Sequence, residues 1–273
     1  MARTARVSTL LVPTHGPIIK PWPKPPAMAM DRTPRFLFEE VRRAEVAYAR
    51  QLNMIARQTG ELIQGAYDPS DPNWHSALDD ILQRFADAIT PWATAAASRM
   101  VREVDARNAK AWRATGKEMG QLIGREWNST PTGQLALQRV AEQVNLIRSL
   151  PLEAAQRVQK LATEAMIGGI RPENMIDEIM KSGAVTRSRA ALIARTETGR
   201  TATEFTRSRA EQVGSTLFIW RTVKDSDVRP SHRRLEGKSF RWDDPPECDP
   251  GYHALPGAIF NCRCWPEPVL NEY

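Results

Sequence analysis

Residues 186–223 read TRSRAALIARTETGRTATEFTRSRAEQVGSTLFIWRTV and change from a helical to a strand pattern at Gly214. Before this glycine, the residues of one mainly apolar face recur every three or four positions. This spacing predicts a helix over 186–213, capped by Thr186. The stripe consists of Ala190, Ile193, Glu197, Thr201 and Phe205. After the glycine, Thr216–Val223 is rich in β-branched and aromatic residues, which is typical of a strand. Lys238–Trp242 alternates in polarity and is expected to pair with that strand.

The preceding residues 35–185 predict one helix after another. Apolar residues at helical spacing form one stripe from Leu37 to Leu62 and another from Trp74 to Trp92, and both are interpreted as core. New helices are expected at Thr90-Pro91, Thr130-Pro131, Pro151 and Pro172, because proline fits the first turn of a helix, and Gly168-Gly169 separates the last two. The sequence therefore predicts an α+β protein. A mostly helical N-terminal region precedes a small C-terminal domain of a helix and a short β-sheet with long ordered loops.

Residues 1–34 contain seven prolines, which exclude a regular helix or a central strand. They predict an extended arm that docks on another subunit. The domains are predicted as this arm, a helical region over 35–149 and a C-terminal domain over 150–273. Pro13 and Pro17 interrupt the apolar part of the N-terminus, so no secretory signal is expected there. No apolar run approaches the roughly 20 residues that span a bilayer, and no membrane partner is expected.

Charge is unevenly distributed toward the C-terminal end. Residues 186–241 carry thirteen Lys or Arg and six Asp or Glu, whereas residues 242–273 carry one Arg and six acidic residues. The basic segment either binds a polyanion such as DNA, pairs with the acidic tail, or is a solvated mixed surface. The DNA-contacting candidates are Arg187, Arg207, Arg209, Arg233 and Arg234. Scattered arginines favour non-specific phosphate binding, and no zinc-finger or helix-turn-helix spacing accompanies them.

Potentially reactive side chains follow the predicted strand in Asp225-Ser-Asp-Val-Arg-Pro-Ser-His232. With Glu197 nearby, Asp225 and His232 have the chemistry for general acid–base work. The other interpretation is structural: Asp225 caps the turn, while His232 and Arg229 bind Glu197 and backbone carbonyls. The structural interpretation is favoured, because no glycine-rich phosphate loop and no nucleophile motif are present.

Five residues have the chemistry to bind zinc: His232, Cys248, His253, Cys262 and Cys264. Cys248 and His253 have a workable spacing. Cys262-x-Cys264 is less suitable, because alternate side chains of a strand face opposite ways. Three cysteines cannot complete a disulfide framework, which favours a reducing compartment or a metal site. We expect no cofactor and favour no metal, with Cys262 and Cys264 as small buried residues and Arg263 paired with an acid such as Asp243 or Asp244.

Several motifs follow one another in a specific order: Ile193-Ala-Arg-Thr-Glu197, Trp220-x-Thr222-x-x-Asp225, Arg229-x-x-His232, Gly237, Pro256-Gly257 and Asn261-Cys-Arg-Cys264. In this order they resemble the phage Mu protein F-like minor head protein family, over roughly residues 150–268. The resemblance implies a minor capsid protein that acts in head morphogenesis and lies in the virion, near the portal or the inner shell. It also implies portal or major capsid protein as partners, with packaged double-stranded DNA as a further candidate. The family is not generally enzymatic. The alternative is a metal-assisted or acid–base hydrolase acting on nucleic acid, because related domains occur in phage-borne toxins.

Glu197 lies on the apolar face of its predicted helix, where an unpaired carboxylate is costly. We expect it to lock the helix to the loops by pairing with Arg229, His232 or Arg263 of the motifs that carry the resemblance. An arginine fits best, since its planar fork can hold both carboxylate oxygens.

Overall fold

The computed structural model describes residues 33–270 except 69, 72–73, 116–130 and 169–175. Five long helices come first: α1 (Thr33–Ala66), α2 (Trp74–Ala88), α3 (Thr90–Thr115), α5 (Pro131–Gly168) and α6 (Ile176–Gln212). The short helix α7 (Pro230–Arg233) lies among the strands β1 (Leu217–Arg221), β2 (Ser239–Arg241), β3 (Glu247–Asp249), β4 (Tyr252–His253) and β5 (Trp265–Val269). The predicted α+β class is confirmed. The arm predicted over 1–34 lies outside the described residues, apart from its last two, which begin α1.

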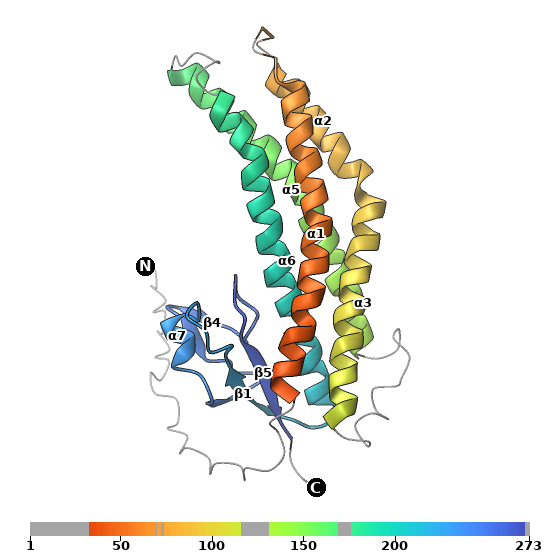
Figure 1. Ribbon diagram of the computed structural model, residues 1–273, viewed down its shortest axis with the longest axis vertical. Coiled ribbons are helices and arrows are strands. Elements are labelled where there is room, and N and C mark those ends of the chain that lie inside the picture. The colour runs from red at the N-terminus through yellow and green to blue at the C-terminus, as the bar shows by residue number, and fades with distance from the viewer. Residues whose placement is uncertain (1–32, 69, 72–73, 116–130, 169–175, 271–273) are drawn as a thin grey trace, which may run out of the picture. The chain divides into compact units, whose positions relative to one another are not determined.

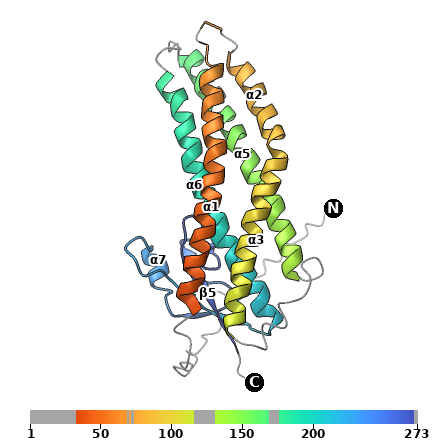
Figure 2. The same ribbon diagram turned by 45° about the vertical axis from the view of Figure 1, so that its right-hand side comes forward.

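The long helices pack side by side through apolar stripes (Figures 1 and 2). Tyr48 and Leu52 of α1 are buried, and α1 contacts both α3 and α6. On α3, the first buried positions facing this core are small, namely Ala93, Ala96 and Ala97, and the larger Met100, Val101 and Val104 follow them. Small side chains allow close helix approach, so α5 and α6 also contact α3. No helix among the described residues is apolar over a stretch long enough to cross a bilayer.

Two predicted helix starts are wrong, because α5 and α6 continue past these residues and are stabilised there by packing against other helices. Thr186 lies inside α6, where its hydroxyl donates to the Ser182 carbonyl at 2.7 Å instead of capping a helix. Pro151 lies inside α5 and lacks the N–H of a regular helix. Burial of Leu150 before it and Ala154 after it, in two separate core clusters, offsets this loss. The starts at Thr90-Pro91 and Pro131 are confirmed, and Pro172 lies outside the described residues.

The strands form two small antiparallel sheets, one in the order β2-β1-β5 and the other pairing β3 with β4. The predicted pairing of the first two strands is confirmed, with Phe218 opposite Phe240. The sequence analysis expected only long ordered loops after Trp242, and there the structure differs, because residues 265–269 form strand β5 despite Pro266 and Pro268. It is an edge strand, where the missing N–H of proline can face outward.

The sheets and loops share a core with the end of α6. Phe218, Trp220 and Trp242 are buried there together with Ala210 of α6 and Trp112 of α3. Helix α5 runs without interruption across residues 149 and 150, so the predicted boundary between the helical region and the C-terminal domain falls inside a helix.

Candidate functional site

Three of the five zinc-ligand candidates, His232, Cys262 and Cys264, meet in the C-terminal core, although the sequence analysis favoured no metal. The Nδ1 atom of His232 lies 3.6 Å from the Cys262 Sγ and 3.4 Å from the Cys264 Sγ. The three donor atoms lie within 4.8 Å of one another, and all three residues are buried. The expectation that the two cysteines face opposite ways is wrong, because strand β5 begins only at Trp265. Asn261, with φ 55°, turns the chain just before them.

His232 is held from several sides. Pro230 begins α7 and fixes the backbone two residues before the histidine. The Trp220 ring meets the imidazole edge-on, with ring centroids 5.3 Å apart. Behind the ring, Nε2 lies 3.7 Å from the Asp249 Oδ1, which itself accepts a 2.8 Å hydrogen bond from the Ser231 hydroxyl. The Nδ1 edge therefore faces the sulfurs and the Nε2 edge faces a carboxylate.

The Cys262 sulfur is surrounded by hydrogen-bond donors. The backbone N–H groups of Gly257 and Cys264 both donate to its Sγ at 3.4 Å. Hydrogen bonding from Cys264, and next from His232, holds the pKa of the Cys262 thiol well below its usual range despite burial. The same pairing with Cys262, and then burial, raises the pKa of Cys264. The Cys262 sulfur therefore accepts two backbone hydrogen bonds and lies beside the Cys264 thiol and the His232 ring.

The other two zinc-ligand candidates, Cys248 and His253, lie apart from the His232–Cys262–Cys264 cluster. The Cys248 thiol donates to the Tyr252 carbonyl at 3.3 Å, and burial raises its pKa. His253 is exposed, and its Nδ1 lies 3.0 Å from the Pro245 carbonyl oxygen.

Glu197 is buried, but its partners lie on helices. Arg139 of α5 is only 3% exposed and forms an ion pair with the Glu197 carboxylate. The Gln143 amide donates to the same oxygen at 3.0 Å, and the Tyr48 hydroxyl donates to Gln143 at 3.2 Å. Burial, followed by the charge of Glu197, raises the pKa of Tyr48. The network therefore joins α1, α5 and α6.

The three expected partners of Glu197 have other contacts, so that part of the prediction is wrong. Arg229 donates to the Phe260 carbonyl at 2.7 Å, and His232 faces the two sulfurs. Arg263 pairs with Asp225 at 2.7 Å and with Asp227 at 3.1 Å, not with Asp243 or Asp244. The loops that carry these three residues therefore make other contacts, and Arg139 forms the ion pair with the Glu197 carboxylate. The link from Glu197 to the loops runs through Arg200, which lies 3.2 Å from Glu197 and donates to the Ala258 carbonyl at 2.9 Å.

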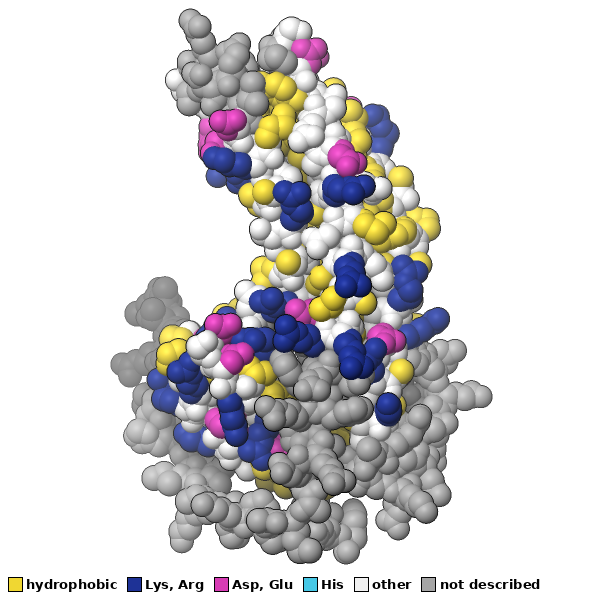
Figure 3. Space-filling model, in the orientation of Figure 1, with side chains coloured by type: hydrophobic (Ala, Val, Ile, Leu, Met, Phe, Trp, Pro, Cys, Tyr) yellow, Lys and Arg dark blue, Asp and Glu magenta, His cyan; other side chains and the backbone are white. Residues whose placement is uncertain are grey.

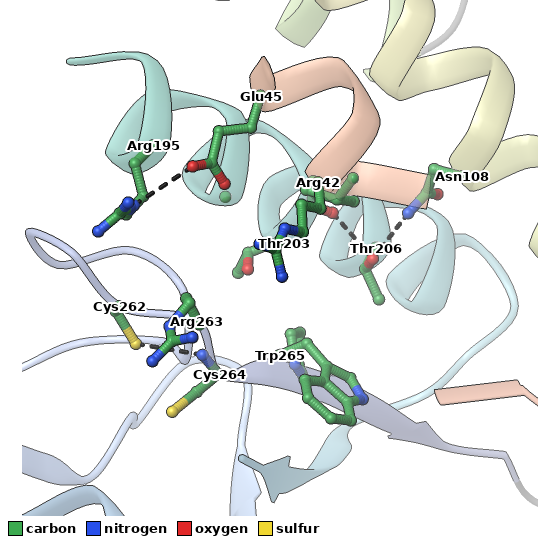
Figure 4. Close-up of a pocket in the computed structure, with 14 residues that line it drawn as sticks. Arg42, Glu45, Asn108, Arg195, Thr203, Thr206, Cys262, Arg263, Cys264 and Trp265 are labelled. Carbon is green, nitrogen blue, oxygen red and sulfur yellow. Dashed lines mark hydrogen bonds and ion pairs between the residues drawn. The ribbon is translucent and has the colours of Figure 1, made fainter. Parts of the chain in front are cut away.

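A pocket lies between the segment Cys262–Pro266 and the helices α1, α3 and α6 (Figure 4). On the helical side, Arg195 of α6 pairs with Glu45 of α1 at 3.3 Å, and Thr206 accepts a 2.8 Å hydrogen bond from Asn108. Cys262–Pro266 forms the opposite side. Cys262 and Cys264 therefore lie next to the interface between the helices and the sheet.

Residues 156–266 match the family described as phage Mu protein F like protein. The resemblance predicted from the sequence is confirmed over these residues, which we call the Mu F-like region. It runs from the second half of α5 to the start of β5 and contains Glu197 and the His232–Cys262–Cys264 cluster.

Two curated relatives are similar to overlapping parts of the chain. An uncharacterized protein of Haemophilus influenzae is 33% identical over 132 residues, 48% of this chain and 29% of the relative. An uncharacterized protein of Methanocaldococcus jannaschii is 31% identical over 118 residues, 43% of this chain and 18% of the relative. The chain thus spans less than a third of the length of these relatives. No solved structure matches.

The hydrolase candidates of the Mu F-like region, Glu197, Asp225 and His232, have separate partners. Asp225 accepts the Asp227 backbone N–H at 3.1 Å, so it caps the turn as the structural interpretation predicts. Among the described residues, the three do not form a group that could share a metal ion, whereas His232 groups with the two cysteines. The arrangement of these residues favours a structural role.

The DNA-contacting candidates differ in exposure. Arg187, Arg233 and Arg234 are exposed, and Arg207 pairs on the surface with Glu211 at 2.8 Å. Arg209 is buried against Asp105 and Asn108, so the prediction that it faces solvent is wrong. Figure 3 shows Lys and Arg side chains gathered over the C-terminal strands and the adjoining helix ends, with fewer acidic groups among them.

Arg139, Gln143 and Asp249 are site residues that sequence reasoning missed. Arg139 and Gln143 lie four positions apart on one face of α5. On that face they follow the buried Ala136 and precede the buried Ile147 and Leu150. Polar side chains in register with an apolar stripe are the signal that could have located them. Asp249 has no such signal, because only the pairing of β3 with β4 and the contact with α7 position it.

Proposed function

We propose that this chain is a minor head protein of a bacteriophage, incorporated in the virion near the portal or the inner shell. The match of residues 156–266 to the phage Mu protein F like family carries the proposal. The structure supports it indirectly. The motif residues of the Mu F-like region form internal contacts, as in a structural element that holds a helical region and a small sheet together.

The main test is incorporation. A phage lacking this gene, complemented with the wild-type chain, is expected to contain the chain in purified full heads and in complexes captured through the portal or major capsid protein. Quantitative mass spectrometry of gradient-purified particles measures this, with a cytoplasmic host protein as the control for contamination. A chain present only at the level of that host protein would contradict the proposal.

The proposal includes non-specific contact with packaged DNA through the exposed basic residues among 186–241. Phosphate contacts release counterions, so affinity for duplex DNA is expected to fall about ten- to a hundredfold between 50 and 200 mM salt, as for roughly two to four phosphate contacts. Fluorescence anisotropy with duplexes of unrelated sequence measures this.

A matched pair of variants locates the contact. The triple change Arg187→Ala, Arg233→Ala and Arg234→Ala should weaken binding and flatten its salt dependence. The control, Arg57→Ala, Lys160→Ala and Lys181→Ala, removes the same charge from side chains that are 75%, 76% and 61% exposed. Equal weakening by both triples would show that net charge, not these positions, determines binding.

A further inference from the structure

We propose that His232, Cys262 and Cys264 bind a zinc ion that fastens α7 to the loop before β5. The ligand atoms are the His232 Nδ1 and the two cysteine sulfurs, with a water molecule in the fourth position. The sequence spacing alone does not favour this site. The inference rests on the folded geometry and does not depend on the proposed function.

The distances between the donor atoms fit a shared tetrahedral ion. Zinc–sulfur bonds of about 2.3 Å and zinc–nitrogen bonds of about 2.0–2.1 Å place the sulfur and nitrogen of two ligands roughly 3.5 Å apart. The observed separations from the His232 Nδ1 are 3.6 Å to the Cys262 Sγ and 3.4 Å to the Cys264 Sγ. Both pairs therefore already have the spacing of a zinc site.

The surroundings also suit metal-bound thiolates. Two backbone N–H groups donate to the Cys262 Sγ, which is how proteins commonly stabilise a ligating sulfur. The Asp249 carboxylate lies on the far side of the His232 ring, where it would orient the imidazole with Nδ1 toward the ion. The His232 Nε2 has no hydrogen-bond partner within bonding distance, so a small shift toward Asp249 would satisfy it.

The donor set points to zinc in preference to magnesium or calcium, because thiolate and imidazole ligands are soft and those ions prefer oxygen. The apolar shell of Trp220 and Leu255 keeps the site away from bulk water. The ion would connect α7 to a loop about thirty residues further along the chain. Such a cross-link suits a region whose strands are only two to five residues long.

The test starts with metal content. The full-length, untagged chain, purified after expression with added zinc, should retain about one zinc ion per chain after dialysis, measured by elemental analysis. Cys262→Ser and Cys264→Ser should each lose most of it. Cys248→Ser is the matched control, because it removes a buried thiol of the same core that lies outside the ligand group. Zinc loss from Cys248→Ser equal to that from the other two would overturn the three-ligand assignment.

Cobalt substitution tests the site without any variant. Wild-type chain stripped of zinc under reducing conditions and titrated with Co²⁺ should develop sulfur-to-cobalt charge-transfer absorption and the intense visible bands of a tetrahedral ion. These should saturate at one equivalent and disappear on adding Zn²⁺. A folded chain with three titratable thiols, no retained zinc and no such absorption would overturn the proposal. So would a chain in which Cys262 and Cys264 form a disulfide under reducing conditions.

Discussion

Glu197→Ala is expected to lower the free energy of unfolding by about 3 kcal/mol. Removing one partner of a buried ion pair typically costs about 3–5 kcal/mol, because the other charge stays buried. The lower end applies here, since Glu142 and Glu204 also flank the Arg139 that remains. Equilibrium urea or guanidinium denaturation, followed by circular dichroism of the helices, measures the effect.

Two further variants separate burial from charge. Glu142→Ala removes another carboxylate partner of Arg139, but the Glu142 side chain is 40% exposed and its loss should cost less than about 1 kcal/mol. Glu197→Gln keeps the shape and one acceptor, and it should fall between the two alanine variants. A Glu197→Ala chain as stable as Glu142→Ala would mean that the buried network contributes no more than a surface pair.

Local patterns located most elements of the fold, because each strong signal lies within a few residues. The apolar stripe through Tyr48 and Leu52 predicts α1. The run of β-branched and aromatic residues over Thr216–Val223 predicts β1. The failures at Pro151 and Thr186 have a common cause. Both are local stop or start signals that tertiary packing overrides, and the packing partners lie on other helices.

The site was harder to predict, because its residues meet only through long-range contacts. The burial of Glu197 follows from helical spacing, yet its partner Arg139 lies 58 positions away on α5. Choosing among distant arginines requires knowing that α5 and α6 are neighbours. The two cysteines show the opposite error: strand alternation was assumed for residues that precede the strand, where the turn at Asn261 directs both thiols to His232.

Gly257→Ala is expected to destabilise the Mu F-like region by about 2–5 kcal/mol, because of both backbone conformation and crowding. Gly257 has φ 85°, a left-handed conformation that costs an L-residue roughly 1–2 kcal/mol. A Cβ there would lie 2.8 Å from the Thr203 Oγ1 and 2.9 Å from the Cys264 carbonyl oxygen, inside contact distance. Overpacking a tight site typically adds about 1–3 kcal/mol.

Gly251→Ala is the control for this change, because it separates the two causes. Gly251 has φ 74°, but a Cβ there meets nothing within 4 Å, so only the backbone cost of roughly 1–2 kcal/mol should appear. Thr203 cannot easily move away from Gly257, and the Cys264 contact is a backbone carbonyl, not the end of a flexible side chain. The threonine hydroxyl is held by a 2.6 Å hydrogen bond to the Pro256 carbonyl, and the backbone of Gly257 approaches Gly199 of α6. Chemical denaturation measures the loss of unfolding free energy in both variants. Equal losses would contradict the prediction, because they would show that Gly257 is not crowded by Thr203 and Gly199 of α6.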